Sequence, residues 1–272
     1  MSFPVALQLY SVRDVAEENT ASVLNQLKEF GYDGVEFAGF CGKTPAELAK
    51  LVAASGLEPV SAHVSINDMR ADINKVINDY KTLGCKHVAV PWLGDEERPG
   101  ASGFEAVLKD LNRFGEILLD AGITLSYHNH DFEFVRIGDE FGFDRIYSSV
   151  PESLLKVEMD TCWVSVAGES PVAYLEKYSG RCPLLHLKDY AGKKSNNMYK
   201  LIGVNENEKA EESDAFELRP LGYGVQDWNA IIKAAEKAGT EWLIVEQDEP
   251  SMNKSRMECA QLSREFLKSI GY

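Results

Sequence analysis

Short apolar runs alternate with amphipathic stretches along the whole chain. The apolar runs have the length of β-strands, and the sequence predicts eight of them, at residues 5–10, 34–38, 59–64, 87–92, 124–130, 154–160, 183–189 and 242–248. The stretches after them have helical periodicity, at residues 21–30, 45–54, 73–83, 104–121, 141–149, 171–179, 228–238 and 256–270. Eight strand–helix units predict an α/β fold, a single (β/α)8 TIM barrel over residues 1–272. A doubly wound sheet is the alternative, but no Gly-x-Gly-x-x-Gly follows the first strand.

Helix boundaries are marked in the sequence. Glycines stand where helices are expected to stop before the next strand, at Gly31, Gly56, Gly84, Gly122 and Gly239. The run Thr-Pro-Ala-Glu at residues 44–47 has the spacing of a capping box with proline in the first turn, so it predicts a helix start.

Alternate residues of the predicted strands divide into an apolar set and a polar set. In a barrel, one set faces the helices and the other faces the interior. The polar set comprises Gln8, Tyr10, Glu36, Ser61, His63, His128, His130, Lys156, Glu158, Asp160, His186, Lys188, Glu246 and Asp248. Branched aliphatic residues ordinarily fill a barrel interior, and barrel enzymes build their sites at the carboxyl ends of the strands. The polar set therefore predicts an active site at that end.

Composition narrows the class of protein. Hydrophobic residues make up 44% of the chain, which predicts a folded protein, and the net charge of −15 argues against nucleic-acid or anionic-membrane partners. The apolar runs are only strand-sized, so neither a signal peptide nor a membrane span is expected. Five scattered cysteines without a Cys-x-x-Cys pair suggest reduced thiols and a cytoplasmic setting.

Residues suited to binding a divalent ion end the last four predicted strands. Strands six to eight supply Asp160, His186 and Glu246, and strand five supplies His128, His130 or Glu133. Such a nitrogen and oxygen set suits one Mn, Co, Mg or Zn ion, with no thiolate to favour zinc. The alternative is a network of salt bridges with lysines, but burying that many carboxylates without a metal cation is costly.

Several motifs resemble those of the sugar phosphate isomerase/epimerase family, whose members are xylose isomerase-like barrels. They are Leu-Ser-Tyr-His-Asn-His-Asp-Phe-Glu-Phe at residues 125–134, Val-Glu-Met-Asp-Thr-Cys-Trp at 157–163, Leu-Leu-His-Leu-Lys-Asp at 184–189 and Ile-Val-Glu-Gln at 244–247. The opening Leu-Gln-Leu-Tyr-Ser-Val-Arg and the later Pro-Leu-Gly-Tyr-Gly-Val-Gln-Asp-Trp resemble the family too, so the match covers nearly the whole chain. Related enzymes include tagatose 3-epimerase, inosose dehydratase and endonuclease IV.

The resemblance implies a metal-dependent enzyme acting on a sugar or keto-sugar. Family members hold one divalent metal with Glu, Asp, His and Glu from strands five to eight, and the last three correspond to Asp160, His186 and Glu246. The leading expectation is an isomerase or epimerase that works through an enediolate. The alternatives are a lyase or dehydratase acting on a keto-sugar or keto-inositol and, in another class, a non-catalytic sugar-binding subunit. DNA repair of the endonuclease IV type is disfavoured by the acidic charge.

Strand five departs from the family pattern. His128 stands where the epimerases have a glutamate, and Glu133 follows five residues later. We expect Glu133 to curl back and complete the metal shell with Asp160, His186 and Glu246, leaving His128 as a base or a further ligand. The catalytic candidates are therefore His128, Glu246 and Glu133. The strand-five and strand-eight glutamates are the paired bases of the epimerases, so the resemblance does not by itself imply their proton-shuttling mechanism here. The dehydratase relatives also carry histidines at this strand, which favours elimination chemistry.

Other inward residues are expected to contact a small sugar-like substrate. The substrate-binding candidates are Glu36, His63, His130 and Lys188. For His63 a hydrogen-bonded core role is the alternative, and for Lys188 it is simple neutralisation of neighbouring acids. The segment 190–225 is expected to be a long irregular loop that covers the site or contacts a partner subunit. A homodimer is expected by analogy with other barrels of this kind.

Overall fold

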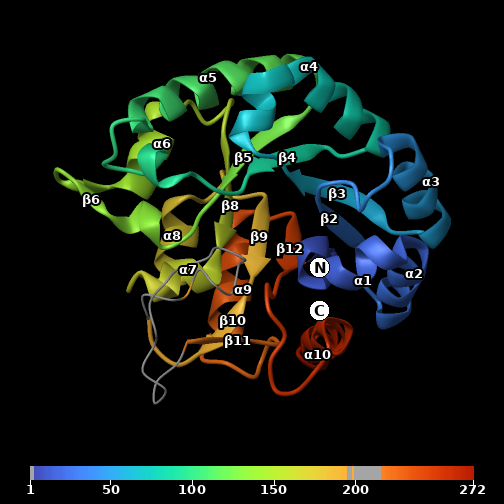
Figure 1. Cartoon of the computed structure of the whole chain (residues 1–272). Helices are drawn as coiled ribbons and strands as arrows, with labels where there is room; N and C mark the ends of the chain where they lie inside the picture. The colour runs from blue at the N-terminus through green and yellow to red at the C-terminus, as the bar shows by residue number, and fades with distance from the viewer. Residues whose placement is uncertain (1–2, 195–197, 199–215) are drawn as a thin grey trace.

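A closed barrel of eight parallel strands forms the centre of the molecule (Figure 1). The structure, a computed structural model, describes residues 3–194, 198 and 216–272. The barrel strands are β1 Val5–Gln8, β2 Gly34–Ala38, β3 Glu58–His63, β4 His87–Val90, β5 Thr124–His128, β8 Lys156–Asp160, β9 Leu184–Leu187 and β12 Trp242–Val245. They follow one another around the ring in chain order, and β12 pairs with β1 to close it. The predicted TIM barrel is thus confirmed.

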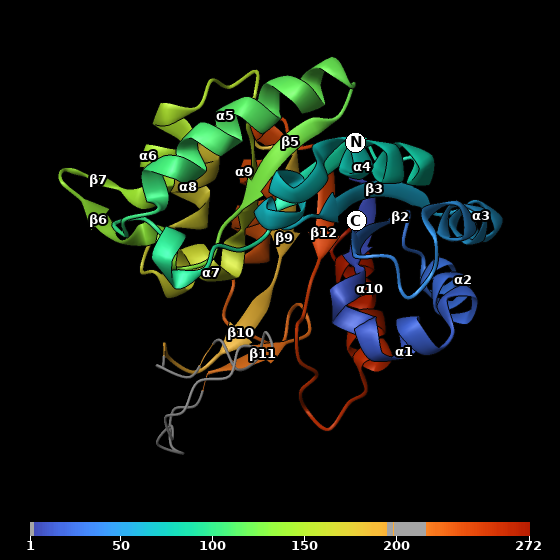
Figure 2. The same cartoon turned by 45° about the horizontal axis from the view of Figure 1, so that its top comes forward.

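Helices surround the barrel (Figures 1 and 2). They are α1 Arg13–Glu18, α2 Thr20–Phe30, α3 Pro45–Ser55, α4 Ile66–Leu83, α5 Phe104–Asp120, α6 Gly142–Ser149, α7 Thr161–Val166, α8 Pro171–Lys177, α9 Trp228–Ala238 and α10 Arg256–Ser269. All eight predicted helices are present. Helix α4 begins earlier than expected, because a turn from Ile66 precedes the non-helical Asp72. Helices α1 and α7 were not predicted, since each has only six residues, too few for helical periodicity to show.

The predicted helix boundaries have the expected backbone geometry. Gly31, Gly56, Gly84 and Gly239 cap α2, α3, α4 and α9 in the left-handed conformation, where a side chain would be strained. Thr44 and Glu47 form the reciprocal capping box at the start of α3.

The interior of the barrel has an apolar floor and a polar upper layer. At the floor, Ala6, Val60, Leu184 and Ile244 pack together, all nearly or fully buried. Above them lie the charged and polar residues of the inward set, including Glu36, Glu158 and His186, which have no exposed surface. Because the outward set packs against the helices, the strand alternation divides the core as the sequence predicts.

Two small ribbons extend the barrel. Strands β6 Arg136–Ile137 and β7 Glu140–Phe141 form a hairpin, and β10 Asp189–Ala191 pairs antiparallel with β11 Glu217–Arg219 (Figures 1 and 2). The expectation of an irregular loop over 190–225 is therefore wrong for the residues of β10 and β11 that fall within it, 190–191 and 217–219. Residues 195–197 and 199–215, on which the lid prediction rests, lie outside the described residues.

Asp189 anchors the β10–β11 ribbon to the barrel. Its buried carboxylate accepts hydrogen bonds from the backbone N–H groups of Gly222, Gly224 and Gln226 and from Trp228 Nε1. A Cβ atom on Gly224 would lie 2.1 Å from Asp189 Oδ1, so only glycine permits this close approach.

Within the described part of the chain, no helix combines the length and the apolar character needed to cross a membrane.

Candidate active site

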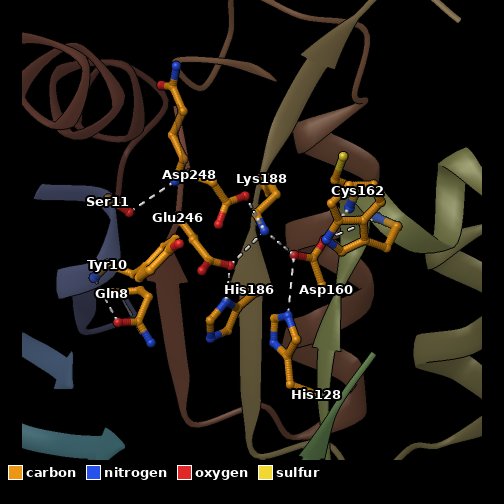
Figure 3. Close-up of polar contacts among 12 residues, drawn as sticks. Gln8, Tyr10, Ser11, His128, Asp160, Cys162, His186, Lys188, Glu246 and Asp248 are labelled. Carbon is orange, nitrogen blue, oxygen red and sulfur yellow. Dashed lines mark hydrogen bonds and ion pairs between the residues drawn. The ribbon is translucent and has the colours of Figure 1, made fainter. Parts of the chain in front are cut away.

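Four potential metal ligands converge at the carboxyl ends of the last four barrel strands. His128 ends β5, Asp160 ends β8, His186 lies in β9 and Glu246 follows β12. One ligand atom from each lies within 4.8 Å of all the others, and all four residues are buried. His186 Nδ1 is 3.0 Å from Glu246 Oε2, and His128 Nε2 is 3.8 Å from Asp160 Oδ2 (Figure 3). We call these residues the four-residue group.

Local structure orients the Asp160 carboxylate. The residue is the N-cap of α7, and its Oδ1 accepts hydrogen bonds from the backbone N–H groups of Cys162 and Trp163. Its own N–H donates to Asn129 Oδ1 of the neighbouring strand end. With Oδ1 occupied by the helix, Oδ2 faces the four-residue group.

Lys188 projects into the same place. Its ammonium nitrogen lies 3.1 Å from Asp160 Oδ2, 2.8 Å from Glu246 Oε2 and 3.0 Å from Asp248 Oδ2 (Figure 3). Burial lowers the pKa of Lys188, but the three carboxylates outweigh burial and hold that pKa well above its usual value. Burial raises the pKa of Glu246, but the opposing effect of Lys188 and His186 is larger. The pKa of Glu246 is therefore held well below its usual value, and this carboxylate stays ionised. Lys188 is therefore a fixed cation at the centre of three acids.

A second polar layer lies directly beneath the four-residue group. His63 Nε2 bonds to Glu158 Oε1 at 2.7 Å, and Gln8 Nε2 donates to Glu36 Oε1 at 2.7 Å. Burial and the neighbouring Glu36 raise the pKa of Glu158 to about 7. Burial lowers the pKa of His63, but the carboxylates of Glu36 and Glu158 outweigh it, so the pKa is raised. His63 consequently favours the protonated state.

The donor set fits a divalent cation. Five buried carboxylates lie in this cluster, from Glu36, Glu158, Asp160, Glu246 and Asp248; Lys188 contacts the last three, and histidines contact Glu36 and Glu158. Uncompensated buried carboxylates are costly, and two histidines with two carboxylates are ligands typical of Mn, Co or Zn. Ligands about 2.0–2.2 Å from an ion span about 4 Å, close to the spacing of the four-residue group. The buried Asp160 Oδ2 makes no regular hydrogen bond, and its contact here is the ion pair with Lys188.

Glu133 does not reach this group. Tyr127 Oη donates to its Oε1 at 2.5 Å, and the backbone N–H of His130 donates to its Oε2 at 2.7 Å. Burial raises the pKa of Glu133 to about 8, because the lost hydration outweighs the hydrogen bonds that Tyr127 and the His130 backbone donate. The expectation that Glu133 curls back to join Asp160, His186 and Glu246 is therefore corrected: a short helical turn at Phe132–Phe134 directs its side chain behind strand β5.

A cavity of about 390 Å³ opens above the four-residue group. Its lining residues are Tyr10, Ala38, His63, Pro91, Trp92, His128, His130, Lys188, Glu246 and Asp248. Trp92 contacts His130 edge to face at 4.8 Å between ring centroids, and Arg98 lies over the Trp92 ring. One wall is thus apolar and aromatic, and the floor is charged.

A larger surface groove of about 730 Å³ lies beside the β6–β7 hairpin, and none of the histidines lines it.

The structure separates the substrate-binding candidates. His63, His130 and Lys188 line the cavity, whereas Glu36 is fully buried below it, bonded to Gln8 and 2.7 Å from His186 Nε2. Sequence reasoning gave no role to Asp248 and Glu158 beyond their place in the inward set. Their contacts with Lys188 and His63 depend on pairing between strands that are distant in the chain.

Comparison with known proteins agrees with this fold. Residues 24–270 match the model of a family described as xylose isomerase-like TIM barrel. An inosose dehydratase from Clostridium botulinum (strain Alaska E43 / Type E3) is 25% identical over 282 residues, covering 94% of this chain and 91% of that protein. One from Clostridium beijerinckii is 30% identical over 164 residues, but the match spans only about half of that relative, 51%, and 58% of this chain.

A solved structure has the same fold. A sugar phosphate isomerase/epimerase from Parabacteroides distasonis ATCC 8503 superposes with a TM-score of 0.80 at 22% identity, covering 100% of this chain and 95% of that one.

Proposed function

The chain belongs to the xylose isomerase-like TIM barrel family, and we propose that it is a divalent-metal-dependent lyase acting on a keto-sugar or keto-cyclitol. The observation that carries this proposal is the identity of the strand-five residue in the four-residue group, His128 rather than a carboxylate. The chain is an enzyme, since its curated relatives are named as dehydratases and its structural neighbour as an isomerase/epimerase.

The absence of a glutamate at the strand-five position matters because epimerisation needs two acid–base groups, one on each face of the substrate carbon. One base removes a proton from the carbon beside the carbonyl, and a second acid returns a proton on the opposite face. At the strand-five position Glu246 faces His128 instead of a second glutamate, and Glu133 is engaged by Tyr127 and the His130 backbone. Elimination instead needs one base and a different acid for the leaving group, which suits an asymmetric set of side chains.

His128, Asp160, His186 and Glu246 would hold the metal. A bound divalent ion acts as a Lewis acid that polarises carbonyl and hydroxyl oxygens and acidifies the neighbouring C–H. As a ligand, His128 would no longer be free to serve as the base.

The two other histidines that line the cavity, His130 and His63, each carry out one of the two proton transfers. Burial and Lys188 hold the pKa of His130 well below its usual value, so His130 is neutral and accepts the proton from the carbon beside the carbonyl. His63, protonated and paired with Glu158, donates its proton to the β-oxygen as the C–O bond breaks. Water or an alcohol departs, a carbon–carbon double bond forms beside the carbonyl, and no oxidant is needed. Lys188 stabilises the negative charge that develops on the carbonyl oxygen.

Isomerisation or epimerisation remains the second candidate. It is favoured by the likeness to the Parabacteroides distasonis isomerase/epimerase and by the position of Glu246, which lines the cavity as a carboxylate. Both reactions begin with the same proton removal, so they differ in what happens to the β-oxygen.

The test uses inosose and a panel of keto-hexoses in deuterated water, with the enzyme loaded with Mn²⁺ or Co²⁺. Lyase activity gives a product lighter by one water with a new olefinic proton signal in the NMR spectrum. A product of unchanged composition that carries one deuterium identifies an isomerase or epimerase and overturns the elimination proposal. Absence of both deuterium exchange and metal uptake contradicts both candidates and favours a sugar-binding subunit.

A further inference from the structure

Each histidine of the four-residue group has one ring nitrogen facing that group and the other facing a different carboxylate. His186 Nδ1 faces Glu246 at 3.0 Å, while its Nε2 lies 2.7 Å from Glu36 Oε1. His128 Nε2 faces Asp160 at 3.8 Å, while its Nδ1 lies 3.3 Å from Glu158 Oε1. The two imidazoles thus bridge two layers of acids, and Figure 3 shows both rings below Lys188.

The lower carboxylates are themselves held in place. Gln8 donates to Glu36 Oε1, and His63 bonds to Glu158 Oε1, each at 2.7 Å. Glu36 and Glu158 have no exposed surface, so water does not compete for these oxygens. Their contacts to His186 and His128 lack the alignment of regular hydrogen bonds, and the two facing ring nitrogens are buried without a regular hydrogen bond. His186 Nε2 also lies 3.4 Å from Glu158 Oε1. A ring nitrogen that carries a proton would find its acceptor there.

We propose that Glu36 and Glu158 are positioning residues that fix the tautomers of His186 and His128, so that the upper nitrogens bind one metal ion. This inference rests on the metal site of the proposed function. A neutral imidazole has one lone pair and one N–H. With the N–H directed to the lower carboxylate, His186 binds metal through Nδ1 and His128 through Nε2. Carboxylates that accept from a metal-bound imidazole orient the ring and raise its basicity.

The same geometry disfavours a second ion in the lower layer. His63, His128, Glu158 and His186 also lie close enough to hold a metal. However, the lower nitrogens of His128 and His186 cannot bind a second ion while the upper ones bind the first, unless both rings lose their remaining proton. The hydrogen bond from His63 already occupies Glu158 Oε1, the oxygen that His128 Nδ1 also faces. The four-residue group would therefore bind one ion, and the lower carboxylates would orient its histidine ligands instead of binding a second ion.

The experiment measures zinc affinity and histidine tautomers, independently of catalysis. Zn²⁺ is titrated in competition with a chromophoric chelator into the wild type, Glu36→Gln, Glu158→Gln and, as a control, Glu133→Gln, which removes a buried carboxylate remote from both imidazoles. We expect one ion per wild-type chain, an affinity about 10- to 100-fold weaker in Glu36→Gln and Glu158→Gln, and no comparable loss in Glu133→Gln. Circular dichroism checks that each variant is folded.

Tautomers are read in the wild type alone, from long-range proton–nitrogen NMR correlations of the zinc-loaded protein. The proposal predicts a proton on Nε2 of His186 and on Nδ1 of His128. The opposite pattern, two zinc ions per chain, or unchanged affinity in both Glu36→Gln and Glu158→Gln overturns it while leaving the metal site intact. A wild type that binds no zinc overturns the metal site itself, and this inference with it.

Discussion

Lys188 and His186 share one carboxylate oxygen: Glu246 Oε2 lies 2.8 Å from the lysine ammonium and 3.0 Å from His186 Nδ1. A metal ion held by His186 and Glu246 therefore takes its place directly beside a fixed positive charge. Asp160 and Asp248 also face this ammonium, so the acids offset the repulsion between the two cations. With the proposed metal bound, the lysine would belong to the metal environment, and the carbonyl oxygen of a substrate would have two cations to approach.

Replacing Lys188 with methionine should destabilise the metal-free protein by about 3 kcal/mol, because three buried carboxylates lose their cation. The control is Lys156→Met, which removes a partly exposed pair with Glu152 and should cost less than about 1 kcal/mol. Urea unfolding at pH 8 with a chelator present measures both. Similar losses in the two variants would mean that Lys188 has no special electrostatic role.

Metal binding should stabilise the fold in a way that depends on the four-residue group. At a free metal concentration about 100 times Kd, the free energy of unfolding should rise by about 2.7 kcal/mol. Thermal unfolding with and without Mn²⁺ should show this as a Tm increase of about 5–10 °C. The increase should vanish in Glu246→Ala and persist in Glu133→Ala. Loss of the increase in Glu133→Ala would restore Glu133 as a ligand.

The Glu133 carboxyl should give the stability an unusual pH dependence. Its pKa is raised from 4.5 to about 8 in the folded state, so between these values the folded chain binds a proton that the unfolded chain does not. The resulting stabilisation is full below pH 4.5 and is lost as the pH rises towards 8. Relative to Glu133→Gln, the wild type should lose about 3 kcal/mol between pH 5 and pH 8. Parallel pH profiles of the two proteins, measured by urea unfolding in chelator, would contradict a protonated Glu133.

Asp189→Asn should destabilise the protein by about 2–4 kcal/mol, since the charged acceptor of five N–H groups becomes a neutral amide. Asp227→Asn is the matched control: Asp227 is the N-cap of α9, and asparagine caps a helix equally well. Chemical denaturation should therefore find the control within about 0.5 kcal/mol of the wild type. If the two substitutions lowered the free energy of unfolding by equally small amounts, the hydrogen bonds to Asp189 would contribute little to stability.

Trp92→Ala should weaken substrate binding more than catalysis. The indole forms the aromatic wall of the cavity and takes no part in the proposed proton transfers. Losing one aromatic contact should raise KM about 10-fold with little change in kcat. Steady-state kinetics on the substrate found in the deuterium experiment would measure the two constants. A large fall in kcat at constant KM would instead assign Trp92 to positioning His130, whose ring it contacts.

The sequence by itself determined the barrel and the end of it that carries the site. Strand alternation is a local property with a period of two, so the inward parity of residues such as His128, Asp160 and His186 could be read without a structure. Helix stops at glycines and the capping box at Thr44 are equally local, and all have the expected geometry. The ends of the strands were less well predicted, because β1 and β9 stop earlier than their apolar runs.

Only the tertiary structure decided which polar residues touch. Glu133 lies beyond the strand, where alternation no longer applies, and a single helical turn directs it to Tyr127 instead of the metal ligands. The contacts of Glu36 with His186 join strands far apart in the chain, at distances set by barrel closure. Ligand binding depends on differences of about an ångström and on which ring nitrogen faces which acid. Periodicity gives the face of a residue, whereas packing between strands sets its partner.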